Sequence, residues 1–388
     1  MSDLSERARA LVIPPFDVLN QQAAALRQAG HHVLSLGQAV PGFPPPKAAV
    51  DAARRALEDP DVHRYSADAG LPSLREGLCD RLREHLHVDA SPDDVIVTAG
   101  GNQAFMLAVL TLLDPGDHVV LAAPYFVNHE MAIRAAGAVP IEAPVSERSG
   151  FRASWDDLER HLTPKTRALV LCTPSNPTGA VIQRDELDRI VFEAASRGIR
   201  VISDETYMHF VFDGEHASAA SSRAWADNVI VVGTFSKSFA MTGWRVGYLL
   251  ADSRVCEQAI KIQDAMIICA PVISQRAVDA AIREDWNYAI RFHDELRTRR
   301  DVLRAGIASI PGLHWEPTGG GFFAFVRFRH HLGSHQLAAA ILEAIHVVTI
   351  PGNAFGESGE GFLRLSYGAV GVNELKEACE RLRGFFAS

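Results

Sequence analysis

The stretch Thr234-Phe235-Ser236-Lys237-Ser238-Phe239, followed by Gly243-Trp244-Arg245-Val246-Gly247, is the most informative part of this chain. It places a lysine directly after hydroxyl residues and an arginine eight positions further on. A lysine amine is unprotonated near neutral pH only in a desolvated or cation-flanked site. Hydroxyl, backbone N–H and guanidinium groups are also the donors that bind phosphate. The stretch therefore suits an amine that forms a Schiff base beside a bound phosphate, as pyridoxal phosphate (PLP) requires. A solvated surface lysine is the alternative interpretation.

Composition and charge are those of an ordinary globular protein. The chain has 388 residues, enough for two domains or one large α/β unit. Its formal net charge is −9 and its Lys and Arg residues are scattered, which gives no indication of a nucleic-acid partner or an anionic membrane surface. The polar N-terminus lacks the apolar core of a signal peptide, and the longest apolar run, 104–113, is too short to span a bilayer. We therefore expect a cytoplasmic protein that binds neither nucleic acid nor membrane.

The five cysteines and sixteen histidines give no pattern of metal ligands. The cysteines are far apart, odd in number and without C-x-x-C spacing, so free thiols in a reducing compartment are favoured over a disulfide or metal role. The pairs His31-His32 and His330-His331 lack a third partner at ligand spacing. The sequence therefore predicts no metal site.

Short β-branched runs alternate with helical patterns between about residues 95 and 250. Each run is mostly apolar on both faces, which is typical of a central strand covered by helices. The alternation predicts βαβ units and a mainly parallel sheet. The predicted strands are 95–98, 118–121, 168–172, 199–203 and 229–233, with helices over 102–113, 128–136 and 184–196.

A different pattern begins after Ser274. It predicts a smaller α/β domain that the N-terminal segment joins, with Gly319-Gly320-Gly321 as either a hinge or a tight turn. The predicted domains are residues 48–285 for the large domain, and residues 1–47 with 286–388 for the small one. The elements expected in the second half are helices over 285–309, 335–345 and 373–386 and strands over 322–328, 347–350 and 362–366.

Polar residues follow four of the predicted strands. They are Gly100-Gly101-Asn102, Asn176, Asp204 and Thr234 to Lys237. Because ligands of parallel sheets lie at the carboxyl ends of the strands, this convergence predicts a binding site. N–H groups at a helix start suit an anion, and a buried carboxylate suits a pyridinium nitrogen. Each feature alone also has a structural explanation, as a turn glycine, a loop asparagine or a capping aspartate.

Five motifs, taken together, resemble the class I/II aminotransferases, which are fold-type I PLP enzymes of the aspartate aminotransferase superfamily. The resemblance covers essentially the whole chain, with the motifs in the family's order and spacing. It implies an α/β fold with a large domain, whose mainly parallel sheet is sandwiched by helices, and a smaller α/β domain. The motifs are Asn176-Pro177-x-Gly179, Asp204-x-x-Tyr207, Thr234-x-Ser236-Lys237, Gly243-x-Arg245-x-Gly247 and Phe362-Leu363-Arg364-Leu365.

The resemblance implies a role in cofactor binding or catalysis for each motif residue. Lys237 would form the internal aldimine and then act as general acid/base, and Asp204 would pair with the pyridine nitrogen. Asn176 and Tyr207 would hydrogen-bond the phenolic oxygen of the cofactor. The implied phosphate ligands are Gly101, Asn102, Thr234, Ser236 and Arg245.

Further residues are implied around the substrate. Phe126 is our candidate to stack on the pyridine ring, with Tyr125 second and core packing as the alternative. Arg364 would bind the substrate α-carboxylate as a bidentate pair, and Asn176 and Ala39 would also contact the substrate. Ala39 stands where family members often have glycine. Tyr65 matches a family tyrosine that reaches the phosphate of the neighbouring subunit, which implies a homodimer with shared active sites.

The cofactor carries the chemistry, and the protein selects the bond that breaks. We expect ping-pong transfer of an amino group from an L-amino acid to a 2-oxo acid. A PLP-dependent lyase or deaminase is the runner-up, and a non-catalytic effector-binding module is a remote alternative. The apolar residues Ile13, Phe16, Val40 and Phe126 suit a neutral, aromatic or methionine-like donor. No second arginine for a dicarboxylate is evident, but an acidic donor remains open.

Overall fold

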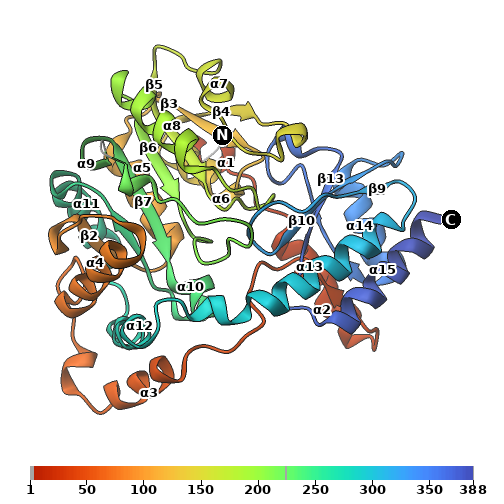
Figure 1. The fold of residues 1–388 in the computed structure, drawn as a ribbon, viewed down its shortest axis with the longest axis horizontal. Coiled ribbons are helices and arrows are strands. Elements are labelled where there is room, and N and C mark those ends of the chain that lie inside the picture. The colour runs from red at the N-terminus through yellow and green to blue at the C-terminus, as the bar shows by residue number, and fades with distance from the viewer. Residues whose placement is uncertain (1–3, 223–224, 388) are drawn as a thin grey trace.

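One large sheet dominates the computed structural model, which describes residues 4–222 and 225–387 (Figure 1). Its strands are β2 (Val95–Thr98), β3 (His118–Ala123), β4 (Val139–Pro144), β5 (Thr166–Cys172), β6 (Arg200–Asp204), β7 (Val229–Thr234) and β8 (Gly247–Leu250). Their order is β2-β8-β7-β6-β5-β3-β4. Only β8 among these described strands runs antiparallel to its neighbours, so the prediction of a mainly parallel sheet is confirmed.

Alternate residues of these strands face two separate hydrophobic cores. Ile96 and Val119 lie in the core under α5 (Gly101–Leu112), α6 (Val127–Ala135) and α11 (Ser253–Ile267). Val97 and Val120 lie in the core that contains α4 (Pro72–Leu86), α7 (Trp155–Glu159), α8 (Arg184–Ser196) and α12 (Val272–Glu284). Neighbouring side chains of a strand point to opposite faces. Helices therefore cover both faces, and this explains why the strands are apolar throughout.

Two strands of the sheet were not predicted from the sequence. The strand β4 contains Pro140 and Pro144 and lies at the edge of the sheet, where a missing N–H donor is tolerated. The strand β8 has four residues and lies between β2 and β7. Both lack the long β-branched run of the other strands.

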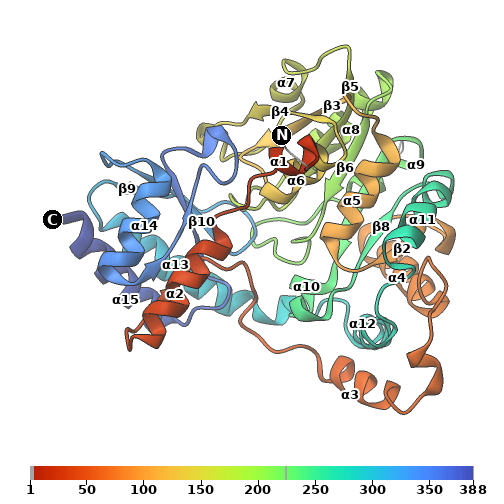
Figure 2. The ribbon, with the colours of Figure 1, turned by 180° about the vertical axis from the view of Figure 1, so that it is seen from behind.

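A smaller antiparallel sheet forms the second part of the molecule. It contains β9 (Leu313–His314), β10 (Phe323–Phe328), β12 (Ile350–Pro351) and β13 (Phe362–Ser366) in the order β12-β13-β10-β9. Figure 2 shows its helices from behind: α2 (Phe16–Gln28), α13 (His293–Ala308), α14 (Ser334–Ile345) and α15 (Val372–Ala387).

The helix predicted over 285–309 begins later than expected. It is preceded by a 3-10 turn, Tyr288–Phe292, and the α-helix starts only at His293. The rings of Tyr288 and Phe292 pack on Phe43, with Phe292 stacked at 4.1 Å between ring centres. Packing of these rings therefore overrides the helical pattern in the first turn.

The N-terminal segment is paired with the C-terminal half. The strand β1 (Leu34–Ser35) runs parallel to β11 (Val347–Val348), and Ser366 N donates to Leu36 O at 2.7 Å. The predicted domain boundaries, 48–285 against 1–47 with 286–388, stay a prediction, and residues 1–3, 223–224 and 388 lie outside the described residues. The other helices are α1 (Glu6–Ala10), α3 (Lys47–Ala56), α9 (Trp225–Asn228) and α10 (Phe235–Ser238).

The backbone of the glycine run 319–321 makes close contacts that join the smaller-sheet part of the molecule to the larger-sheet part. Gly320 N donates to Gly179 O at 2.9 Å, and Gly321 N donates to Phe210 O at 2.7 Å. A Cβ atom on Gly320 would lie 2.7 Å from Phe210 O, so a side chain does not fit there. No described helix has both the length and the apolar character that crossing a membrane requires.

Candidate active site

A cavity of about 380 Å³ lies where the predicted strand-end residues meet the N-terminal segment. We call it the site cavity. Every residue that the sequence analysis predicts for the cofactor and substrate site, except Tyr65, lines it. These lining residues are Ala39, Gly101, Asn102, Phe126, Asn176, Asp204, Tyr207, Thr234, Ser236, Lys237, Arg245 and Arg364.

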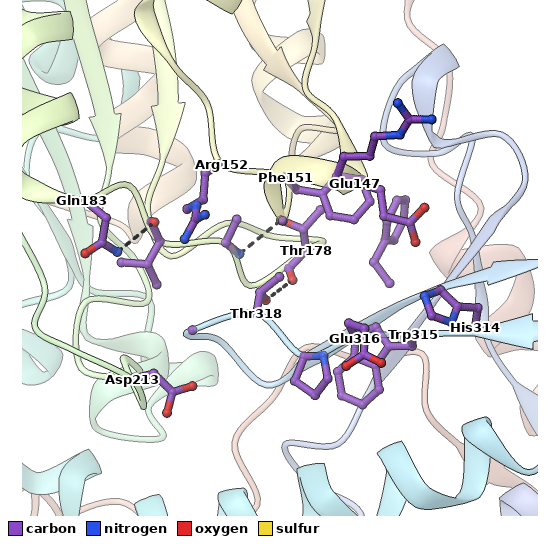
Figure 3. Close-up of a pocket in the computed structure, with 17 residues that line it drawn as sticks. Glu147, Phe151, Arg152, Thr178, Gln183, Asp213, His314, Trp315, Glu316 and Thr318 are labelled. Atoms are coloured by element: carbon purple, nitrogen blue, oxygen red, sulfur yellow. Dashed lines mark hydrogen bonds between the residues drawn. The ribbon is translucent and has the colours of Figure 1, made fainter.

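A second cavity of about 540 Å³ lies between the loops of the two sheets (Figure 3). Its walls include Thr178 and Thr318, which a hydrogen bond joins, and the ring of Trp315. Its acidic residues Glu147, Asp213 and Glu316 are all in ion pairs with arginines. None of its described lining residues is a lysine or a cysteine. The site cavity is therefore the candidate for covalent amine chemistry.

Lys237 lies on the short helix α10, which begins where β7 ends. Its Nζ donates a hydrogen bond to the backbone carbonyl of Ala39 at 2.6 Å. Burial, followed by the positive charges of Arg364 and Arg245, lowers the pKa of the Lys237 amine from 10.5 to about 8. The amine is thus available as a nucleophile much nearer neutral pH than an ordinary lysine.

Asp204, at the end of β6, is buried and held by two hydrogen bonds. Its Oδ1 accepts from Thr206 N at 2.9 Å, and its Oδ2 lies 2.9 Å from His129 Nε2. The carboxylate can only accept, so the imidazole N–H donates. Burial raises the pKa of Asp204, but the bonds from His129 and Thr206 and the histidine charge outweigh burial and lower the pKa overall. Asp204 is therefore an anion inside the cavity.

His129 is a site residue that sequence reasoning missed. It lies on the first turn of α6, three residues after Phe126, and its ring stacks on Phe105 at 4.2 Å. The ring of Phe126 meets His129 edge-on at 5.5 Å. The available signal was the spacing Phe126-x-x-His129 after a strand, since residues three apart on a helix share a face.

Arg364, on β13, is a buried cation without an acidic partner among the described residues. Only 2% of it is exposed, and burial lowers its pKa from 12.5 to about 10. Its guanidinium donates to Asn176 Oδ1 at 2.9 Å and to Gly37 O. A buried charge needs a compensating partner. The open position on this guanidinium therefore suits a carboxylate that enters from solution.

Three aromatic rings hold the Arg364 guanidinium in place. The ring centres of Phe16, Phe323 and Phe355 lie 5.4, 5.2 and 5.1 Å from its Cζ. Contacts of this length with ring faces are attractive for a cation. Tyr207 packs edge-on against Phe323 at 5.1 Å, and burial raises the pKa of its phenol.

A further group of lining residues suits an anion, and we call it the anion cradle. It contains Gly101, Thr234, Ser236 and Arg245. Thr234 and Ser236 are joined through their hydroxyl groups at 2.9 Å, and Arg245 donates to Ala99 O at 3.2 Å. Gly101 begins α5, whose first N–H groups lack helical partners. Gly100 has φ of +89°, a backbone conformation that favours glycine, and a Cβ atom there would lie against the Arg245 guanidinium. Hydroxyl groups, a guanidinium and a helix start together suit a phosphate.

Three residues that the sequence analysis considers for the site do not line the cavity. Tyr65 is 76% exposed and does not line the cavity of its own chain. Ile13 is 75% exposed and also absent from the lining, so its expected place beside the substrate stays a prediction. Phe16 and Val40 do line the cavity, whereas Tyr125 hydrogen-bonds Glu130 away from it.

Comparison with known proteins identifies close relatives. Residues 31–382 match the family model described as aminotransferase class I and II. The chain is 35% identical to aromatic-amino-acid aminotransferase 2 of Thermococcus litoralis over 362 residues, covering 92% of each chain. It is 35% identical to aspartate aminotransferase of Pyrococcus abyssi, covering 90% of each chain.

Solved structures agree with the fold. The structure titled aspartate aminotransferase from Thermus thermophilus with maleate superimposes with a TM-score of 0.93 and 31% identity. The match covers 99% of this chain and 100% of that one. The similarity therefore includes both sheets and the segment that connects them.

Proposed function

The chain belongs to the class I and II aminotransferase family and is an amino-acid aminotransferase, and from this premise we propose that it uses pyridoxal phosphate held in the site cavity. The observation that carries the proposal is that one cavity holds a buried acid, a lysine with a lowered pKa, an anion cradle and an arginine with no acidic partner among the described residues.

The residues of the site cavity fit this cofactor. Asp204 is the anion that would keep the pyridine nitrogen protonated, and His129 would hold Asp204 ionised. The proposed phosphate ligands are Gly101, Asn102, Thr234, Ser236 and Arg245, with Tyr65 contributed by a second subunit. Bound pyridoxal phosphate supplies the electron sink and the carbonyl carbon that accepts the amino group.

The chain's own groups would then position the substrate and move its proton. Arg364 would pair with the α-carboxylate, and Asn176, already bound to Arg364, would fix its orientation. Asn176 and Tyr207 would face the phenolic oxygen of the cofactor, and Phe126 would cover its ring. The Lys237 amine, with its lowered pKa, would take the proton from the substrate Cα and deliver it to the carbon that accepts the amino group.

We further propose a neutral L-amino acid, aromatic or methionine-like, as donor and a 2-oxo acid as acceptor. Phe16, Val40 and Phe126 line the cavity and suit an apolar side chain. The enzyme is proposed to act in the cytoplasm as a homodimer. Support for the dimer comes from the exposed position of Tyr65, which matches the family's cross-subunit tyrosine.

The test is a titration of the cofactor-saturated protein with neutral amino acids and no 2-oxo acid, while the visible spectrum and ammonia are recorded. We expect loss of the visible band of the bound cofactor, formation of oxo acid and no ammonia. Ammonia release would instead indicate a lyase or deaminase.

The variant Lys237→Ala should fold and lose this conversion, because it lacks the amine that moves the proton. Lys261→Ala, which removes an exposed lysine of α11, is the matched control and should behave as wild type. Normal conversion by Lys237→Ala would contradict the role proposed for Lys237.

A further inference from the structure

The first turn of α2 forms the wall of the site cavity beside Arg364. Phe16, Asp17 and Asn20 all line the cavity, and the Phe16 ring lies 5.4 Å from the Arg364 guanidinium. Leu19 and Ala23 of the same helix are buried in a hydrophobic core, which fixes the orientation of the helix. If Arg364 binds the α-carboxylate of the substrate, then the cavity-lining residues Asp17 and Asn20 lie near the rest of the substrate.

The described lining of the cavity offers no cation for a second carboxylate. Its lysine and arginine side chains are Lys237, Arg245 and Arg364. The first two face the proposed cofactor, and the third takes the α-carboxylate. A desolvated carboxylate on the substrate side chain needs a positive partner of its own. The described lining of this chain's cavity therefore provides no further lysine or arginine to pair with the side-chain carboxylate of a dicarboxylic donor.

Asp17 adds a negative charge at the same wall. Its side chain forms no ion pair and no hydrogen bond with any described residue, so no described side chain is paired with its charge. The amides of Asn20, Gln38 and Asn128 line the same cavity and are neutral. A carboxylate at this position repels an acidic side chain and attracts N–H groups or a cation.

We propose that Asp17 is a specificity-determining residue that disfavours aspartate and glutamate and favours donors whose side chain is neutral with N–H groups or is positively charged. The inference rests on the proposed function, because it assumes that amino acids bind with their carboxylate on Arg364. It adds a charge criterion for the donor, which the apolar residues of the cavity do not supply.

The test compares donors that differ in charge but hardly in shape. The pairs are asparagine with aspartate and glutamine with glutamate. The second-order rate constant of the half-reaction is measured for each donor with the cofactor-loaded enzyme and no 2-oxo acid, so that the acceptor plays no part. Wild type is compared with Asp17→Asn, which keeps the shape and removes the charge.

Asp185→Asn is the matched control. Asp17 and Asp185 are both exposed acidic residues in the first turn of an α-helix, but Asp185 does not line the cavity. The two variants therefore lose the same helix-start charge, and only one changes the substrate cavity.

We expect the amide-to-acid ratio of rate constants to exceed one in wild type and to fall roughly three- to tenfold in Asp17→Asn. The ratio should not change in Asp185→Asn. An unchanged ratio in Asp17→Asn, or a wild type that prefers the acids, would overturn the inference while leaving the aminotransferase assignment intact.

Binding of an unreactive dicarboxylate gives a second readout. Succinate should bind roughly three- to tenfold more tightly to Asp17→Asn than to wild type, as measured by calorimetry, because the repulsion is gone. Equal affinities would count against the role of Asp17. If no amino acid reacted with wild type at all, the proposed function would fail, and the inference with it.

Discussion

Lys237 is a lysine whose neutral form is favoured by its surroundings. Burial contributes most, and the charges of Arg364 and Arg245 add to it, so the pKa falls from 10.5 to about 8. In protein stripped of cofactor, acylation of Lys237 should therefore follow a titration with a midpoint near 8. Peptide mapping after labelling across pH measures this, with the exposed Lys261 as the control for reagent reactivity.

The same shift predicts how stability depends on pH. The folded protein gives up the Lys237 proton at lower pH than the unfolded chain, so between pH 8 and 10.5 the unfolded state binds more protons. The free energy of unfolding should then rise with pH across this window in wild type relative to Lys237→Met. Urea unfolding measures the difference, and a flat difference would mean that the amine is not desolvated.

Sequence motifs identify those site residues whose neighbours in the sequence stand at a fixed spacing. Lys237, Asp204 and Asn176 each belong to a short motif, and each lines the cavity. His129 and Asp17 were not predicted, because their roles come from contacts between distant segments. His129 reaches Asp204 across 75 positions of sequence. Asp17 lines the same cavity as Arg364 only because α2 packs on α14 and β11, and no local pattern shows that packing.

At the level of elements, the strands with β-branched residues on both faces were predictable. The periodicity of β5 to β7 is set by burial under helices on both sides, so the sequence alone shows it. The edge strand β4, with its two prolines, and the short β8 carry little of that signal. The start of α13 depends on packing of the Tyr288 and Phe292 rings, which only the folded structure shows.

The contact between the loops that contain Gly179 and Gly320 leads to a prediction at the scale of elements. Gly179 has φ of +73°, and a Cβ atom there would lie 2.2 Å from Gly320 O. Gly179→Ala should therefore lower stability by more than the roughly 1–2 kcal/mol of a left-handed alanine, because the backbone of the neighbouring loop must also move. Thermal unfolding monitored by circular dichroism measures the loss.

Gly214→Ala is the control for that prediction. Gly214 also has positive φ, +99°, but a Cβ atom there meets nothing within 4 Å. This variant has the backbone strain without the collision. Equal melting temperatures for the two variants would show that the loops are not in close contact in solution.

At the scale of the whole molecule, Tyr65 tests whether two chains share each active site. The Lys237→Ala variant lacks the amine, and a Tyr65→Ala variant would lack a phosphate ligand that it donates to its partner. In a mixed dimer one site carries both defects and the other carries neither. Random mixing of equal amounts should therefore restore about a quarter of the wild-type sites.

The measurement is turnover at limiting cofactor after the two variants are unfolded together and refolded. Separately refolded variants that are combined afterwards are the control, because they form no mixed dimers. Activity no higher than the sum of the separate variants would contradict a shared site. Sedimentation of the wild type gives the oligomeric state independently.

The pairing of β1 with β11 also sets the order in which this protein becomes active during its synthesis. Residues 37–40 contact Arg364 and Lys237 and lie just after β1 in the sequence. The strand that pairs with β1 is β11, which begins only at Val347. A ribosome needs roughly 15–60 s to add the intervening residues. The nascent chain therefore has no complete substrate site until translation is almost finished.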